Sequence, residues 1–199
     1  MNSASDGTAH HPADTELFDD TLSCELALPA DFKLGNGIGR FGAGEALLRG
    51  LAQIEDLRSD DGSEERGDLP LQLQRMDAKL DLMLVLLGRL ARQHEDTLPL
   101  RPLRWSRRGL RLELGSRSGA APGAAGLLRL QPSDWLPDYL ELPVQVLAEA
   151  VAGSGFHLWL RFETQPASME EALERHLFRL HRRQIADNRR AAERAPPVP

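Results

Sequence analysis

The most regular hydrophobic pattern of the chain lies between residues 73 and 90. Six apolar residues follow one another there at alternating steps of three and four: Leu73, Met76, Leu80, Met83, Leu87 and Leu90. This spacing is the a/d pattern of a coiled coil, so the residues are predicted to line one side of a helix as a heptad seam. Further apolar residues at 82 and 84–86 flank the seam. They favour a bundle of more than two helices, or a helix packed within its own subunit.

The remaining apolar positions predict a shorter helix, several strands and a closing helix. Residues 44–57 have helical spacing, and beyond Pro99 the period changes to two. Four segments are predicted to be strands: 110–114, 127–130, 139–152 and 156–164, the last two joined by a turn at Gly153 and Gly155. Leu173, Leu177 and Leu180 mark a C-terminal helix. Several short strands within this length are typical of a small antiparallel barrel, so the fold class is α+β.

Charge and composition suggest how the chain is organised. Residues 1–96 hold 19 acidic and 9 basic side chains, whereas residues 97–199 hold 11 acidic and 15 basic. A change of sign near residue 97 favours two modules with different surfaces. The apolar run at 22–28, which ends at Pro29, is either an extra strand or a lead-in. We expect a disordered tail (1–20), an N-terminal segment with the helical oligomerisation module (21–96), a barrel with its closing helix (97–190) and a second disordered tail (191–199).

Several classes of function are disfavoured by composition. A net charge of −6 argues against a generally basic nucleic-acid binder, so no DNA partner is expected. The single cysteine, Cys24, excludes an internal disulfide and a cysteine zinc cage, and the six histidines lack the spacing of a metal site. No nucleophile, base and oxyanion grouping can be assembled, so neither catalytic residues nor enzyme activity are predicted. Without an apolar span or signal peptide, a cytoplasmic protein with no membrane insertion is expected.

The C-terminal half resembles a known bacterial family. Residues 105–114 (WSRRGLRLEL) look like its Asp/Asn-x-Ser-x-x-Gly turn leading into a strand, 144–148 and 157–162 like its hairpin, and 173–183 like its closing helix. That family is the PilZ domain, a small six-stranded barrel best known as a cyclic di-GMP receptor. A preceding heptad helix is similar to the arrangement in the atypical, tetrameric PilZ proteins. The resemblance covers residues 21–190 and implies a PilZ-like barrel, a homotetramer and a place in cyclic di-GMP signalling.

The resemblance also indicates a candidate ligand site. Such domains bind the dinucleotide with an Arg-x-x-x-Arg pair and with the turn, which supplies an acceptor and a hydroxyl. Ser106 and Gly109 match the turn, but Arg104 replaces its Asp/Asn, and arginine has no acceptor. No two of Arg89, Arg92 and Arg101 are four residues apart, and Arg104 and Arg108, which have the required spacing, straddle the turn itself. The candidate ligand residues of this degraded motif are Arg101, Arg104, Ser106, Arg107, Arg108 and Gly109.

Two interpretations of these arginines stay open at this point. They form either a rewired anion or dinucleotide site, beside which Trp105 could stack on a guanine, or a solvated or intersubunit patch facing the acidic N-terminal half. The resulting prediction is an oligomeric adaptor with weak or lost dinucleotide binding, an unidentified protein partner and no cofactor. The alternatives are a genuine cyclic di-GMP receptor that uses the rearranged arginines, and a purely structural oligomerisation scaffold.

Overall fold

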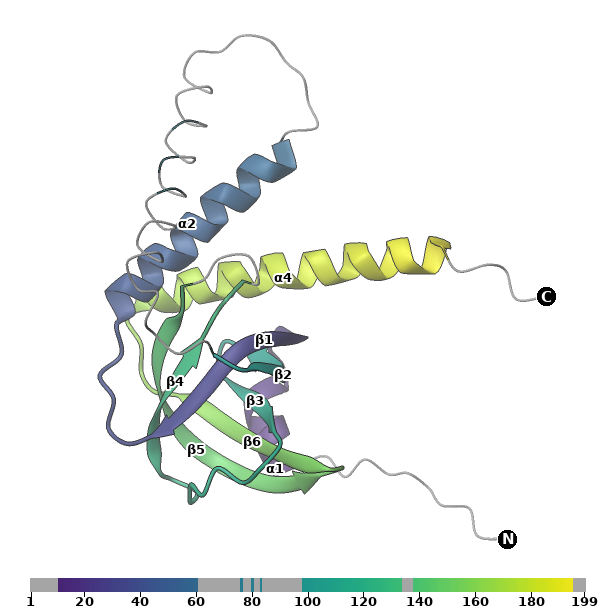
Figure 1. Ribbon diagram of the computed structural model, residues 1–199. Coiled ribbons are helices and arrows are strands. Elements are labelled where there is room, and N and C mark those ends of the chain that lie inside the picture. The colour runs from purple at the N-terminus through teal and green to yellow at the C-terminus, as the bar shows by residue number, and fades with distance from the viewer. Residues whose placement is uncertain are drawn as a thin grey trace, which may run out of the picture.

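A computed structural model describes residues 11–60, 76, 80, 83, 98–133 and 138–194 (Figure 1). Its elements follow one another as α1 (Pro12–Phe18), β1 (Ser23–Leu34), α2 (Phe41–Asp60), β2 (Leu100–Ser106), β3 (Gly109–Leu114), β4 (Ala125–Leu130), β5 (Leu140–Ala152), β6 (Gly155–Phe162) and α4 (Ala167–Arg194). The six strands close into an antiparallel barrel in the order β1-β2-β3-β6-β5-β4. The predicted α+β class with a small antiparallel barrel is therefore confirmed.

The barrel closes through β1, which changes partner halfway along its length. Its first half pairs with β2 up to Pro29, and its second half pairs with β4 from Ala30 onward. Proline has no N–H to give to a neighbouring strand, so it is tolerated where the ladder changes. The Ala30 N–H donates to the Pro99 carbonyl at 2.9 Å, and the Gln131 N–H donates to the Pro29 carbonyl at 2.9 Å. The apolar run at 22–28 is thus part of a barrel strand that continues beyond Pro29.

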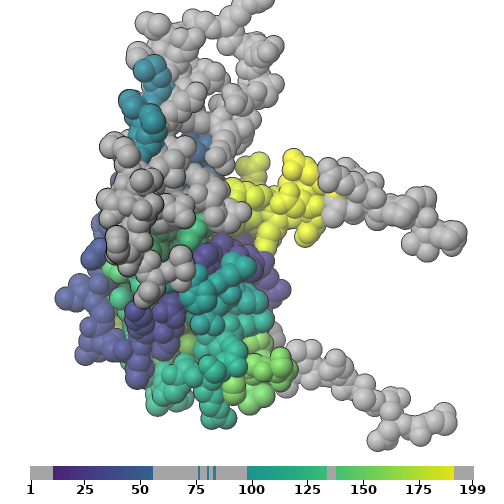
Figure 2. Space-filling view, viewed as in Figure 1, coloured from purple at the N-terminus to yellow at the C-terminus, as the bar shows by residue number. Residues whose placement is uncertain are grey.

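Alternating strand residues fill the barrel, and α4 covers one of its ends (Figure 1). Leu110 and Leu112 point inward with no exposed surface, whereas Arg111 between them is partly exposed. The N-terminal half of α4 buries Met169, Leu173 and Leu177 against the same core. Its C-terminal half extends away from the barrel, as the space-filling view shows in yellow (Figure 2). None of the helices in the described ranges has the length and apolar character of a membrane span.

The described structure differs from the expected organisation in three places. Residues 12–18, expected in a disordered tail, form α1. Strand β1 belongs to the barrel, so the boundary expected near residue 97 does not separate the sheet from the N-terminal segment. Helix α4 continues to Arg194 instead of ending near residue 190. A two-turn helix and a strand that crosses a proline show too little local periodicity to be recognised without their long-range partners.

The heptad seam is described at three of its six positions. Met76, Leu80 and Met83 are helical, and 60%, 49% and 53% of their respective surfaces are exposed. Their spacing places them along one side of a helix. Leu73, Leu87 and Leu90 lie outside the described residues. Large apolar side chains aligned and accessible in this way are typical of an interaction surface.

Candidate ligand site at the turn between β2 and β3

The matching serine of the turn is buried and fully engaged. Ser106 has no exposed surface, and its hydroxyl donates to the Leu17 carbonyl of α1 at 2.7 Å. The same oxygen accepts the Arg108 N–H at 3.1 Å, which holds the turn in shape. A hydroxyl has a single proton to donate. The Ser106 hydroxyl can therefore donate to a ligand only if its hydrogen bond to the Leu17 carbonyl of α1 is first broken.

The matching glycine is required by the sheet itself. A Cβ on Gly109 would lie 2.1 Å from the Leu160 carbonyl oxygen of β6 and 2.9 Å from Leu17 Cδ2 of α1. Only a residue without a side chain permits this close approach of two backbones and a helix. The motif-like spacing of Ser106 and Gly109 thus has a structural explanation in the packing of β6 and α1.

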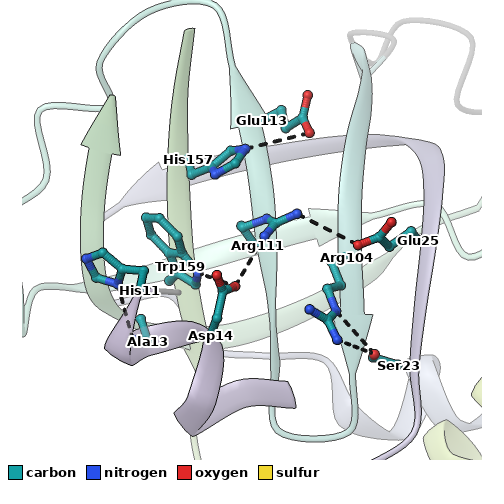
Figure 3. Close-up of polar contacts among 10 residues, drawn as sticks. All are labelled: His11, Ala13, Asp14, Ser23, Glu25, Arg104, Arg111, Glu113, His157 and Trp159. Carbon is teal, nitrogen blue, oxygen red and sulfur yellow. Dashed lines mark hydrogen bonds and ion pairs between the residues drawn. The ribbon is translucent and has the colours of Figure 1, made fainter. Parts of the chain in front are cut away.

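Two of the candidate arginines hold α1 and β1 in place. Arg108 Nη1 donates to the carbonyl oxygens of Glu16 and Asp19, at 3.1 and 2.9 Å. These carbonyls lie at the C-terminal end of α1, where a helix presents unpaired acceptors and partial negative charge. Arg104 donates from Nε and Nη2 to Ser23 Oγ at 3.2 and 3.1 Å (Figure 3), and its guanidinium lies 4.4 Å from the Phe18 ring centroid.

The other two candidate arginines bind partners in different parts of the fold. Arg101 Nε donates to the Ala30 carbonyl at 3.1 Å, next to the point where β1 changes partner. Arg107 forms an exposed ion pair with Glu174 of α4 at 2.7 Å. The structure therefore does not gather the four arginines into one pocket. Trp105 is also unavailable to a guanine, because it is fully buried, with its ring centroid 5.6 Å from that of His176.

A second group of polar side chains, which is not among the predicted site residues, lies beneath α1 (Figure 3). Asp14 of α1 is 6% exposed, and its Oδ1 accepts from Trp159 Nε1 at 2.9 Å and from Arg111 Nη1 at 3.2 Å. The His11 ring stacks on Trp159 with centroids 4.3 Å apart, and Arg161 pairs with Glu16 at 2.9 Å. Arg111 and Trp159 are neighbours in the pairing of β3 with β6. Their outward positions in alternating strands were visible in the sequence, but the helix that covers them was not.

One titratable group borders this arrangement. His157 meets the Trp159 ring edge-on at 5.5 Å and lies 3.7 Å from Glu113 (Figure 3). Its pKa is lowered first by burial and then by the positive charge of Arg111, against the opposing effect of Glu113. The imidazole is therefore neutral at neutral pH. The positive charge of this side of the barrel comes from its arginines.

A cleft of about 510 Å³ lies beside the turn, between the end of α1, the end of β6 and the start of α4. Three arginines line it: Arg107, Arg108 and Arg161. Four glutamates line it as well: Glu16, Glu163, Glu170 and Glu174. Gln165, 8% exposed, also borders it, and its Oε1 has no hydrogen-bond partner among the described residues. The carboxylates outnumber the guanidinium groups, so the cleft is a poor site for a ligand with two phosphates.

No cluster of three or more His, Cys, Asp and Glu side chains that could hold a metal ion occurs among the described residues. The groups around the turn are donors and cations that hold the C-terminal end of α1 against the barrel.

Comparison with known proteins agrees with the resemblance noted in the sequence. A family model described as "atypical PilZ domain, cyclic di-GMP receptor" matches residues 48–190. A crystal structure of a pathogenic protein from Xanthomonas campestris, a tetrameric PilZ domain self-assembled through an unusual helical bundle, is 58% identical. The match covers 90% of this chain and 99% of that one, with a TM-score of 0.78.

One further solved structure is only distantly similar to this chain. The PilZ domain of Escherichia coli YcgR, solved with cyclic di-GMP, is 17% identical over 48% of this chain and 79% of that one. The TM-score between the two structures is 0.36. No curated protein matches the chain. The family match over residues 48–190 and the similarity to the Xanthomonas protein show that the chain belongs to the atypical PilZ family of cyclic di-GMP receptors.

Proposed function

We propose that this protein is an oligomeric adaptor of cyclic di-GMP signalling that binds the dinucleotide weakly or not at all. The main support for this proposal is that the retained groups of the motif already form hydrogen bonds within the chain. Ser106 and Arg108 bind the C-terminal end of α1, and Arg104 binds Ser23. Guanine N–H groups need an acceptor, and the motif position that would supply one holds an arginine, which has none.

Releasing these groups for a ligand has an energetic cost. If Ser106 turned to a ligand, the Leu17 carbonyl would lose its 2.7 Å hydrogen bond. Leaving one such buried acceptor unpaired costs about 1–3 kcal/mol. That cost corresponds to a loss of about 5-fold to 150-fold in affinity. The excess of glutamates in the neighbouring cleft weakens binding of a phosphodiester further.

The heptad seam supports assembly into a homotetramer. Met76, Leu80 and Met83 expose about half or more of their surfaces along one side of a helix. Burying such residues against copies of themselves is the ordinary way in which a heptad pattern is stabilised. The similar Xanthomonas protein is itself described as a tetramer assembled through a helical bundle. We place the same role on the seam of this chain.

An adaptor of this kind needs a protein partner and no chemistry of its own. The matching family model is described as a receptor domain. We propose that this chain acts as an adaptor in the bacterial cytoplasm, without enzyme activity or a cofactor. The tetramer would present several barrels at once. Multiple copies of one weak binding surface raise the overall strength of partner binding.

A second candidate, a genuine cyclic di-GMP receptor, is favoured by one observation. The cleft of about 510 Å³ has a volume suited to a small ligand and contains an unpaired buried acceptor, Gln165 Oε1. Guanine N–H groups could donate to that oxygen once the Gln165 side chain turned into the cleft, while Arg108 and Arg161 bound a phosphate. In this case the arginines of the cleft replace the missing motif pair.

Calorimetric titration of the full chain with cyclic di-GMP distinguishes the two candidates. The adaptor predicts no heat of binding at ligand concentrations near a millimolar, an affinity weaker than about −4 kcal/mol. The receptor predicts micromolar or tighter binding that Arg108→Ala abolishes. Arg117→Ala is the matched control, because Arg117 is an exposed arginine beyond the other end of β3. Micromolar binding that depends on Arg108 and not on Arg117 would overturn the adaptor proposal.

A further inference from the structure

We infer that the outer side of the barrel beneath α1 is a docking site for an acidic amphipathic helix of a partner protein. In this inference, which rests on the proposed adaptor function, α1 is an internal occupant that the partner helix displaces. We call this surface the α1 face and define it by the outward residues Arg104, Arg111, Trp159 and Arg161, with Arg108 of the turn.

The α1 face is built by regular strand geometry. Outward positions of β3 and β6 pair across the sheet, Arg111 with Trp159 and Gly109 with Arg161. On the other side of β3, Arg104 of β2 pairs with Arg111. Trp159 supplies a broad apolar surface, and Leu147, Ala148 and Ala150 of β5 extend it. The result is an aromatic centre surrounded by arginines, a combination common at protein-binding sites.

Helix α1 shows which chemistry this surface recognises. The segment 12–20 carries four carboxylates and no basic side chain. Asp14 binds both Arg111 and Trp159, and Glu16 binds Arg161. Three and four residues after Asp14, Leu17 and Phe18 bury their side chains with at most 4% exposed. A carboxylate followed by two apolar residues at i+3 and i+4, on one side of a short helix, is therefore the recognised pattern.

The α1 face also binds the backbone carbonyls at the C-terminal end of α1. Arg108 donates to the Glu16 and Asp19 carbonyls, and Ser106 donates to the Leu17 carbonyl. These donors meet the unpaired acceptors that any helix presents at its C-terminal end. They do not depend on the side chains of α1. A helix from another protein would find the same donors, whereas an extended peptide would not present its carbonyls in this arrangement.

The contact between α1 and the barrel is separable from the core. Ala13, Leu17 and Phe18 form their own cluster with Trp159, distinct from the cluster that fills the barrel and contacts α4. All six strands are paired in a closed ring without α1. A helix of seven residues is too short to be stable by itself. Uncovering the α1 face therefore costs the contacts of one short helix and leaves the barrel intact.

Binding of the α1 sequence as a separate peptide tests this inference. The probe is a fluorescent peptide of residues 11–22, and the protein is the full chain carrying Leu17→Asp, which loosens its own α1. The variant is expected to bind the peptide at least about tenfold more tightly than the wild type. In the wild type, the tethered α1 competes at an effective concentration in the millimolar range. A peptide with the same Leu17→Asp change is the matched control and should not bind.

A second peptide tests the requirement for acidity. Asp14→Asn in the peptide retains its size and an acceptor for Trp159 but removes the charge opposite Arg111. We expect it to bind at least about tenfold more weakly, since hydrogen bonds to a charged group are about twice as strong as neutral ones. Equal binding of both peptides would overturn the inference of an acidic partner, because adhesion through apolar residues alone would explain it.

Hydrogen exchange on the wild-type chain tests separability without any substitution. The amides of α1 are expected to exchange at least about 100-fold faster than those of β3 and β6, because α1 opens locally. Equal protection would mean that α1 leaves only on global unfolding and would overturn the inference, as would a folded Leu17→Asp variant that does not bind the peptide. Neither the peptide binding nor the hydrogen exchange depends on cyclic di-GMP. The calorimetric titration with cyclic di-GMP therefore tests the proposed function separately from the docking inference.

Discussion

Gly109→Ala is the sharpest test of how the turn is built. Gly109 occupies the motif glycine position, yet its surroundings are those of a packed sheet. An added Cβ would lie 2.1 Å from the Leu160 carbonyl oxygen, whereas real Cβ atoms essentially never approach closer than 3.0 Å. Strands β3 and β6 would have to separate by about 0.9 Å at this point. Leu17 of α1, 2.9 Å from the same Cβ position, would also have to move.

The magnitude follows from the nature of the atoms in contact. A backbone carbonyl in a barrel ladder cannot rotate away as a flexible side chain can, so the cost should lie at the upper end for overpacking, about 3 kcal/mol. For a chain of this length, 1 kcal/mol corresponds to about 2–4 °C in Tm. We therefore expect Gly109→Ala to lower the Tm by about 6–12 °C.

Thermal unfolding followed by circular dichroism, at one protein concentration, measures this effect. Gly115→Ala is the matched control, because a Cβ there meets nothing within 4 Å and the backbone is not left-handed. That variant should have an unchanged Tm or one raised by about 1–4 °C, through the lower entropy of its unfolded chain. Equal Tm values for the two variants would refute the close approach of β3, β6 and α1 at Gly109.

Three further predictions concern assembly and buried groups. Leu80→Asp places a charge in the heptad seam and should reduce the mass of the assembly in sedimentation analysis. The control Ile38→Asp, at an apolar residue that is 92% exposed, should leave this mass unchanged. An unchanged mass for Leu80→Asp would contradict a role of the seam in assembly. Burial lowers the pKa of His176 from 6.5 to about 4, so the unfolded state takes up more protons between these values. The free energy of unfolding should therefore fall by about 3 kcal/mol as the pH drops through this window, and His176→Gln should flatten that slope in denaturant titrations. Burial raises the pKa of the Cys24 thiol to about 11, so a thiol reagent at pH 8 should label the protein only after unfolding; prompt labelling would contradict the packing of β1.

The elements with strong local patterns were predictable from sequence, and those that depend on distant partners were not. Leu110 and Leu112 alternate with polar residues, and the hairpin around Gly153 joins two apolar runs, so β3, β5 and β6 were expected where they occur. Strand β1 was harder, because a proline ordinarily interrupts a strand. It continues because Pro29 coincides with the change of partner from β2 to β4.

The candidate site shows the same limit more clearly. Three candidate arginines are close in sequence but donate to groups far apart in the chain. Arg101 donates to Ala30, Arg104 to Ser23 and Arg107 to Glu174. Closeness along a strand does not make a pocket, because neighbouring side chains alternate between its two sides. Two other arginines, Arg111 and Arg161, both bind carboxylates of α1 although they lie 50 residues apart in the chain. Helix α1 has only seven residues, so its sequence gives almost no periodic signal.

We propose that α1 holds the place at the turn that a ligand would need and that cyclic di-GMP does not displace it. The most direct measurement is a ¹H–¹⁵N spectrum of the full chain during titration with cyclic di-GMP. The Trp159 indole N–H reports on α1 because it donates to Asp14 at 2.9 Å, and Trp159→Phe assigns its signal. We predict that this signal stays in place up to about 1 mM dinucleotide, which means an affinity no better than about −4 kcal/mol. A shift that saturates at micromolar ligand would contradict it.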